Sequence, residues 1–209
     1  MHRRQFMAGL GVALGSVVTA CDAAQDPDTN RSRRVEGARG SKLDAGALED
    51  IMLGSSDLGC GGGGGLDAAR ELIASDLASG LSFHLLDVSD LGDDDMVASP
   101  YTLESLAPVS EEMQARLDSI ESKNAAPTEA SFSLLEKHLG VQFAAVIVGE
   151  IGPLSLAEAL SIGARIGVPS LDADTVGRAT PEINQHSVRA AGHAITPAAA
   201  VTQFGDEII

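Results

Sequence analysis

The sequence predicts an α/β fold, with a layered, partly parallel central sheet flanked by helices in a single domain. Segments with apolar residues at helical spacing alternate with short apolar runs of strand length. One of these runs, Phe143–Val148, is apolar without interruption, which is typical of a strand covered on both faces. Short strands separated by helices are the pattern from which parallel sheets are built. The 209 residues suffice for one such domain with a tail.

Residues 1–20 have the pattern of an export signal. Arg3 and Arg4 precede an apolar run, Met7–Val18, that is shorter than the roughly 20 residues needed to span a bilayer. Paired arginines followed by Gln and Phe resemble a twin-arginine export signal. The small residues before Cys21 resemble a lipobox, in which the thiol receives a diacylglycerol group. We therefore expect a lipoprotein anchored to the membrane on its extracytoplasmic side; the alternative is a buried N-terminal helix that ends in an incidental cysteine.

The segment 21–42 contains almost no large apolar side chains and predicts a flexible tether between the lipid and the domain. The whole chain carries a formal net charge of −16, which repels nucleic acid and anionic lipid surfaces. Nucleic acid is therefore excluded as a partner, and a solvated acidic surface accounts for the charge. With Cys21 lipidated, Cys60 is the remaining thiol, so no intrachain disulfide is expected.

The globular pattern covers residues 43–209. Asp44 is placed to cap a first helix, and Gly140 is placed to end a later one. Pro181 favours the start of a helix over residues 182–190. The other predicted helices cover residues 43–52, 66–77, 110–120, 128–139 and 156–166, and the predicted strands cover residues 83–88, 96–99, 143–148 and 168–171, with an extended end from Val201.

A glycine-rich loop is the strongest local feature. Glycines expose backbone N–H groups, and a helix that begins at Leu66 would place its dipole behind them. The sequence predicts that Gly61, Gly62, Gly63 and Gly64 bind an anion or ligand; a tight turn is the alternative. A helix rather than a strand precedes the loop, which argues against a dinucleotide fingerprint, and no Lys-Ser or Lys-Thr follows, which excludes a P-loop.

Cys60 lies within this loop. Nearby amides and a helix N-terminus could activate its thiol as a nucleophile. The alternative is a small residue in a cramped turn.

The segment 172–182 follows a predicted strand, at the sheet edge where open α/β sheets bind ligands. Asp172 and Asp174 are two residues apart, which puts both carboxylates on one side of an extended segment. We predict that Asp172, Asp174 and Glu182 are catalytic and that Arg178 binds the ligand. A metal site built from the same carboxylates and a polar turn held together by Asp–Arg pairs are the alternatives.

Two further residues are candidates for the same crevice. Glu150 closes the strand Phe143–Val148 and is predicted to bind the ligand. His186 lies four residues after Glu182 and shares a helical face with it if this segment is helical. No Cys/His cluster has zinc spacing, and the sequence identifies neither a cofactor nor a metal. We expect the acidic segment and the glycine loop to meet at the carboxyl edge of one sheet.

These motifs together resemble the N-terminal domain of the DUF917, or S-methyl thiohydantoin desulfurase, family. The resemblance is carried by Gly61–Gly65, Glu150-Ile151-Gly152 and the Asp172–Glu182 motif, in that order, and spans about residues 43–209. It implies an α/β domain and chemistry on hydantoin-like rings. It also implies hydrolytic removal of a methylthio group, with Asp172 or Asp174 as the base and the glycine loop as the anion stabiliser.

Family members usually continue into a second, mostly β domain. The resemblance therefore implies three alternatives: a hydrolase of a hydantoin-like molecule, a non-catalytic small-molecule-binding or interaction domain, or half of a split or truncated enzyme that needs a separate β-domain chain. The family often has further Gly and Asn after the Glu-Ile-Gly segment, where this chain has Pro153-Leu154-Ser155.

Overall fold

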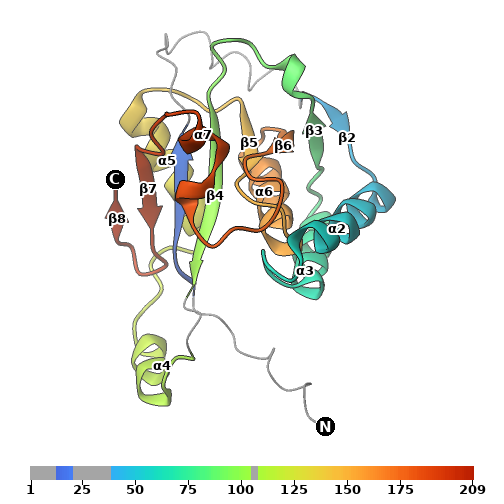
Figure 1. Cartoon of the computed structure of the whole chain (residues 1–209). Helices are drawn as coiled ribbons and strands as arrows, with labels where there is room; N and C mark the ends of the chain where they lie inside the picture. The colour runs from blue at the N-terminus through green and yellow to red at the C-terminus, as the bar shows by residue number, and fades with distance from the viewer. Residues whose placement is uncertain (1–12, 21–38, 105–107) are drawn as a thin grey trace.

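The computed structural model describes residues 13–20, 39–104 and 108–209, and gives the backbone alone for residues 13–20, 103 and 104. In these ranges the strands form one eight-stranded sheet in the order β2-β3-β6-β5-β4-β1-β7-β8 (Figure 1). The strands are β1 (Ala13–Ala20), β2 (Ser41–Lys42), β3 (His84–Leu86), β4 (Val97–Glu104), β5 (Ala145–Val148), β6 (Ser170–Asp174), β7 (Ala198–Val201) and β8 (Glu207–Ile208). The helices are α2 (Ala45–Gly59), α3 (Leu66–Ala78), α4 (Glu111–Asp118), α5 (Pro127–Leu139), α6 (Pro153–Ile166) and α7 (Ser187–Ala190), with short 3-10 turns at Val88–Asp90 and Ile183–Gln185.

The middle of the sheet is parallel and its flanks are antiparallel. Strands β3, β6, β5 and β4 pair in parallel, and the helices α5 and α6 connect β4 to β5 and β5 to β6. Strands β1, β7 and β8 extend the sheet antiparallel on one side, and β2 extends it on the other. The predicted α/β class with a partly parallel sheet is confirmed.

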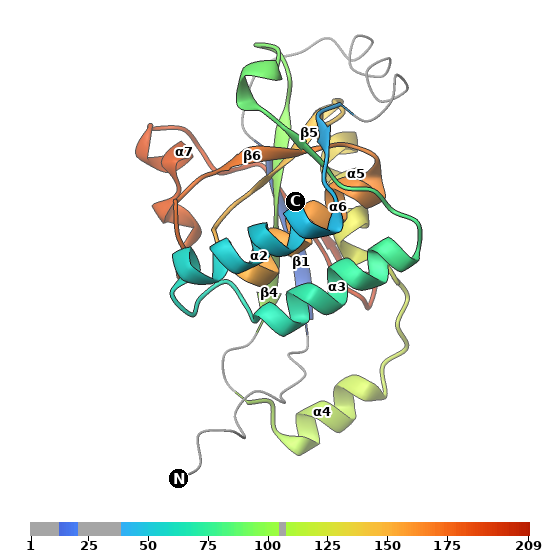
Figure 2. The same cartoon turned by 90° about the vertical axis from the view of Figure 1, so that its right-hand side faces the viewer.

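Most helices cover one face of the sheet. Helices α5 and α6 pack directly on the strands, and α2 and α3 pack on α6. Figure 2 shows the sheet nearly edge-on, with α5 and α6 on one side and α7 on the other. The irregular segment between β6 and β7, which contains α7, therefore covers the opposite face. Helix α4 has no buried residue and lies apart from the sheet (Figures 1 and 2).

Local sequence explains where these helices begin and end. Asp44 caps α2, because its side chain accepts a hydrogen bond from the N–H of Ala47 at 2.8 Å. Gly140 ends α5 in the left-handed conformation, with φ +70°, and donates its N–H to Glu136 at 2.8 Å. Proline occupies the first turn of both α5 and α6, where its missing N–H costs nothing.

The core is built from two apolar clusters on the helical face and a smaller one on the opposite face. In the largest cluster, Phe132 of α5 meets Phe143 edge to face, with ring centroids 5.8 Å apart. The second cluster joins α2 and α3 to α6 around Leu48, Ile73 and Leu160. Strand β5 is buried almost throughout, as its continuous apolar sequence predicts.

One predicted helix is wrong, and two segments outside the predicted domain have a defined backbone. Residues 13–20, within the predicted export signal, form strand β1 inside the sheet. At the end of the predicted tether 21–42, Arg39 forms an ion pair with Asp95 at 3.0 Å and residues 41–42 form strand β2. The prediction of one helix over residues 182–190 is wrong, because the backbone at His186 is extended and separates a 3-10 turn from α7.

The predicted signal residues 1–12, the tether 21–38 and the lipidation site Cys21 lie outside the described residues. Among the helices that the structure describes, none has the length and apolar character needed to cross a membrane.

Candidate functional site

Three segments that are far apart in the sequence meet where β5 and β6 end. The carbonyl oxygen of Gly63 accepts hydrogen bonds from two N–H groups in the first turn of α6, at 2.9 and 3.1 Å. A Cβ atom added at Gly152 would lie 2.3 Å from the Cα atom of Gly63, and one added at Gly62 would lie 2.6 Å from the Cβ atom of Ala179. We call this contact of Gly62, Gly63, Gly152 and Ala179 the glycine junction. The structure thus brings together the glycine loop, the Glu-Ile-Gly segment and the acidic segment.

Packing and backbone conformation account for the glycines of this loop. Gly61, Gly63 and Gly64 have φ of +92°, +68° and +79°, a region that glycine adopts without strain. The N–H of Gly62 donates to the carbonyl of Gly59 at 2.8 Å, and Gly63 caps α6. Their predicted role in anion binding stays a prediction.

Glu150 ties the end of β5 to two neighbouring segments. Its Oε1 accepts a hydrogen bond from the hydroxyl of Ser155 at 3.1 Å, and its Oε2 accepts one from the N–H of Thr180 at 2.6 Å. The side chain is half-buried. Glu150 therefore positions the segment 175–186 against the first turn of α6.

The two predicted catalytic aspartates lie together, at a cavity of about 250 Å³ between α6 and the end of β6. Asp174 Oδ1 accepts hydrogen bonds from the N–H groups of Val176, at 2.7 Å, and Gly177, which closes a turn after β6. Asp172 is exposed. The remaining lining of this cavity is mostly apolar and includes Val148, Ile151 and Leu171.

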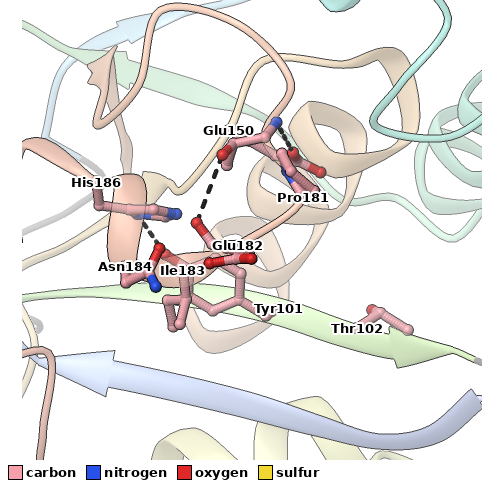
Figure 3. Close-up of a pocket in the computed structure, with 9 residues that line it drawn as sticks. Tyr101, Thr102, Glu150, Pro181, Glu182, Ile183, Asn184 and His186 are labelled. Carbon is pink, nitrogen blue, oxygen red and sulfur yellow. Dashed lines mark hydrogen bonds between the residues drawn. The ribbon is translucent and has the colours of Figure 1, made fainter.

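Glu182 and Glu150 line a different and larger cavity, of about 630 Å³. We call it the Tyr101 cavity, because β4 contributes Tyr101 to its wall (Figure 3). The predicted catalytic set is therefore divided between two cavities, with Asp172 and Asp174 at one and Glu182 at the other. The Tyr101 cavity is lined by Tyr101, Thr102, Glu150, Thr180, Pro181, Glu182, Ile183, Asn184 and His186.

His186 is the buried titratable group of the Tyr101 cavity, and its side chain is held from two sides. Its Nδ1 lies 2.9 Å from the hydroxyl of Tyr101 and 2.5 Å from the hydroxyl of Thr175 (Figure 3 shows the Tyr101 contact). Only 3% of the residue is exposed. Tyr101 packs against Gly149, where an added Cβ atom would lie 2.5 Å from the phenol ring. Gly149 therefore allows the tyrosine to reach the histidine.

The hydrogen-bond pattern assigns the tautomer of His186. The hydroxyl of Thr175 donates its one proton to the carbonyl of Gly149 at 2.6 Å, because a carbonyl only accepts. The short contact between Nδ1 and the Thr175 oxygen then requires a proton on Nδ1. Nε2 consequently carries a lone pair in the neutral ring and can accept a proton.

Burial lowers the pKa of His186 below its ordinary value, and the negative charges of Glu150 and Asp174 oppose part of that shift. The imidazole is therefore neutral at pH 7. The neutral form is the one in which a histidine acts as a base.

The other predicted site residues lie outside the Tyr101 cavity wall. Arg178 has an exposed side chain, and its carbonyl accepts a hydrogen bond from the N–H of Ile151 at 3.0 Å. Cys60 is exposed and ends α2 in the left-handed conformation, with φ +48°, and its thiol points to the carbonyl of Asp57 at 3.2 Å. Within residues 39–104 and 108–209, no group of three or more His, Cys, Asp or Glu side chains is placed to hold a metal ion.

Sequence reasoning missed the partners of His186. Tyr101 lies 85 positions before His186 in the sequence. Thr175 follows Asp174 directly, inside the predicted site segment, but no role was predicted for it. The one available signal was Gly149 directly before Glu150, since a glycine at the end of a buried strand indicates a close approach of another group.

Comparisons with known proteins agree with this fold. The crystal structure of a protein from Chromobacterium violaceum is 27% identical in sequence and superposes with a TM-score of 0.60, over 81% of this chain. The chain spans 44% of the length of that protein. No curated protein matches the chain.

The family described as S-Me-THD-like, N-terminal domain, matches residues 46–209, which include every residue of the glycine junction and of the Tyr101 cavity. The chain therefore belongs to the S-Me-THD-like N-terminal domain family.

Proposed function

We propose that the Tyr101 cavity binds a hydantoin-like ring and that His186 promotes its hydrolysis. The observation that carries the proposal is the neutral imidazole of His186, fixed by Tyr101 and Thr175 in a wall that also carries Glu182. A cavity of about 630 Å³ accommodates a small heterocycle together with a water molecule.

The polar groups of the cavity match the edges of such a ring. The carboxylate of Glu182 can accept a hydrogen bond from a ring N–H, and the amide of Asn184 can donate one to a ring carbonyl. Ile183 and Pro181 offer apolar surface beside them. A neutral ring with alternating donors and acceptors fits this lining better than a large anion, because Glu150 and Glu182 are carboxylates.

The proposed substrate is an S-methyl thiohydantoin, and the proposed reaction is its hydrolysis. Nε2 of His186 takes a proton from water, and the water oxygen bonds to the ring carbon that carries the methylthio group. The carbon–sulfur bond then breaks, the sulfur takes the proton from the imidazolium, and the remaining hydroxyl proton moves to the ring nitrogen. Water and the S-methyl thiohydantoin become a hydantoin and methanethiol.

The test is the release of methanethiol from an S-methyl thiohydantoin by the purified full chain, followed with a thiol reagent. The variant His186→Gln is expected to lose about a hundredfold or more in kcat, the usual contribution of a general base. Asp172→Asn is the matched control, since Asp172 lies at the other cavity, and it is expected to keep the rate. Loss of activity in the control but not in His186→Gln would return the catalytic role to the aspartates.

A second candidate is a binding domain that becomes catalytic only together with a second domain. It is favoured by the length of the relative, of which this chain spans 44%. In this case the full chain alone binds a hydantoin-like molecule, measured by calorimetry, without turnover. In that case Glu182→Gln weakens binding of the hydantoin-like molecule. His186→Gln has no effect on turnover, because the chain alone releases no methanethiol.

We further propose that the chain is exported and anchored by lipid at Cys21, on the pattern of residues 1–21. Expression in a bacterium with twin-arginine export and lipoprotein processing is expected to give a membrane-bound product whose mass shows residues 1–20 removed and a diacylglycerol group added. The variant Cys21→Ser is expected to stay unprocessed. A wild-type product with residues 1–20 intact would refute the anchor.

A further inference from the structure

A second cavity lies at the carboxyl end of the sheet, on the face that most helices cover. It has a volume of about 250 Å³ and is lined by α2, α6, Leu85 of β3 and the ends of β5 and β6. Among the residues that the structure describes, it shares no lining residue with the Tyr101 cavity. We call it the Asp172 cavity, after one of the two carboxylates in its wall. The hydrolysis proposed for His186 makes no use of it.

Most of the wall of the Asp172 cavity is hydrocarbon. Val148 of β5, Leu160 of α6 and Leu171 of β6 line it and are buried. Protein interiors contain few voids larger than a water molecule, so an apolar space of this size is not ordinary packing. An engineered apolar cavity of about 150 Å³ stays dry and takes up benzene. The Asp172 cavity therefore has the size and the lining to hold an apolar group as large as a six-membered ring.

An irregular strand borders this space. The hydroxyl of Ser170 donates to the carbonyl of Ala159 at 3.2 Å, which joins β6 to α6 beside the cavity. Beyond this point the pairing of β6 with β5 shifts: the partners of Val146 and Val148 are four residues apart in β6, although the two valines are two apart in β5. Asp172 is the central residue of this bulge. Bulges are common beside functional sites, where they redirect side chains.

Two carboxylates belong to the wall of this mostly apolar space. Asp172 is exposed and forms no hydrogen bond or ion pair with any residue that the structure describes. Asp174 uses Oδ1 to accept the N–H groups of the turn after β6, which leaves Oδ2 available to a ligand. No lysine, arginine or histidine is among the described residues that line the cavity. The negative charge in this wall therefore lacks a cation contributed by the lining itself.

We propose that the Asp172 cavity binds a small primary amine, whose apolar body fills the space beside α6 and whose ammonium group contacts Asp172 and Asp174. An ammonium group only donates hydrogen bonds and an ionised carboxylate only accepts them, so the two are complementary. A metal ion suits the cavity less well, because it needs more oxygen ligands than two carboxylates in a hydrocarbon wall provide. The site is separate from the Tyr101 cavity, and the inference does not rest on the hydrolysis proposed there.

The probe is benzylamine, titrated into the full chain at pH 7 and followed by calorimetry. We expect one saturable site per chain with a Kd on the order of 1 mM or tighter, as suits a ligand of this size. Benzyl alcohol has the same ring without the charge, and methylamine has the charge without the ring. Each is expected to bind about tenfold more weakly or worse, because each lacks one of the two interactions.

Two variants with matched controls locate the bound amine. Asp172→Asn removes a charge at an exposed position and is expected to weaken benzylamine about tenfold while leaving benzyl alcohol unchanged. Its control is Asp67→Asn, which removes an exposed charge on α3 outside the cavity wall and should keep the affinity. Ile51→Trp enlarges a half-buried side chain in the wall and should weaken both ligands. Its control is Leu53→Trp at an exposed position of the same helix, which should weaken neither.

The outcomes decide between the sites and between the ligands. Equal affinity for benzylamine and benzyl alcohol, or for benzylamine and methylamine, would overturn the assignment. So would wild-type affinity in Asp172→Asn, or no saturable binding at about tenfold the expected Kd. Loss of binding in His186→Gln alone would place the amine in the Tyr101 cavity and overturn it as well. If Ile51→Trp fails to fold, the comparison of Asp172→Asn with Asp67→Asn decides. Methanethiol release tests the proposed hydrolysis separately, so either proposal can fail without the other.

Discussion

The hydroxyl of Tyr101 lies 2.9 Å from Nδ1 of His186, a contact that joins strand β4 to the segment on the opposite side of the sheet from most helices. The rings are tilted at 54° with centroids 5.5 Å apart. Because Thr175 approaches the same nitrogen, the ring has one orientation and one tautomer. This arrangement makes His186 the residue on which the proposed chemistry and the pH dependence of the domain both depend.

Stability should fall on acidification through the pKa of unfolded histidine. Burial lowers the pKa of His186 in the folded chain, so the unfolded state binds the proton more readily. Folding stability is then fully present above about pH 6.5 and declines as the pH falls toward the lower pKa of the folded state. Thermal unfolding between pH 8 and pH 5 should show this decline, reduced in His186→Gln and retained in the exposed control His193→Gln. Equal curves for the two variants would assign the decline to other groups.

Neutralising Glu150 should lower the pKa of His186 further. The negative charge of Glu150 raises that pKa against the effect of burial, and Glu150→Gln removes the charge while an amide oxygen can still accept the hydrogen bond from Thr180. Histidine ring resonances followed by NMR across pH should titrate at lower pH in this variant. An unchanged or higher pKa would mean that the charge of Glu150 is not felt at the imidazole.

A methyl group at Gly149 should displace Tyr101. The added Cβ atom would lie 2.5 Å from ring atoms of the tyrosine, so the ring or the strand must move. We expect Gly149→Ala to cost about 1–3 kcal/mol in unfolding free energy, as overpacking does, and to reduce any methanethiol release with it. The control is Gly54→Ala on α2, where the added Cβ atom meets nothing within 4 Å beyond the adjoining backbone of its own helix and stability should rise by up to about 1 kcal/mol. Urea unfolding measures the unfolding free energy of both variants and should give opposite changes for Gly149→Ala and Gly54→Ala.

The buried carboxylate of Asp76 should matter more for stability than an exposed ion pair. Arg165 contacts Asp76 at 2.7 Å, the hydroxyl of Ser161 donates to the same carboxylate, and only 3% of Asp76 is exposed. Asp76→Ala is expected to cost about 3 kcal/mol, because it leaves the Ser161 hydroxyl and Arg165 without their acceptor. Glu49→Ala, which removes an exposed pair with Arg70, should cost clearly less than Asp76→Ala, because solvent screens that pair. Similar losses in chemical denaturation would contradict this ranking.

The elements with local determinants could be predicted from the sequence. Helix α5 begins at a proline and ends at Gly140, and β5 is a short run of apolar residues, so capping and burial patterns were sufficient. The helix predicted over residues 182–190 failed because His186 is drawn into contact with Tyr101 and Thr175, and those contacts hold its backbone extended. Periodicity within nine residues contains no information about a tyrosine on β4.

The candidate site was predicted only in part for the same reason. The sequence indicated that the glycine loop and the acidic segment meet, and the contact of Gly62 with Ala179 places them together. It left a polar turn open as an alternative but did not reveal that Asp174 closes that turn through backbone N–H groups, or that Glu182 faces a different cavity. Side-chain direction at the end of β6 depends on that turn, which the spacing of two aspartates does not specify.

The cap that Gly63 provides to α6 has a consequence for how the chain can be divided. The first turn of α6 depends on a carbonyl from a loop that precedes it by about ninety positions, so this helix lacks an acceptor until the α2–α3 pair has docked. A fragment that begins after the glycine loop should therefore show fraying at the start of α6, and co-expression of the two pieces should restore it. The formation of α6 therefore depends on the distant glycine loop as well as on the sequence of the helix itself.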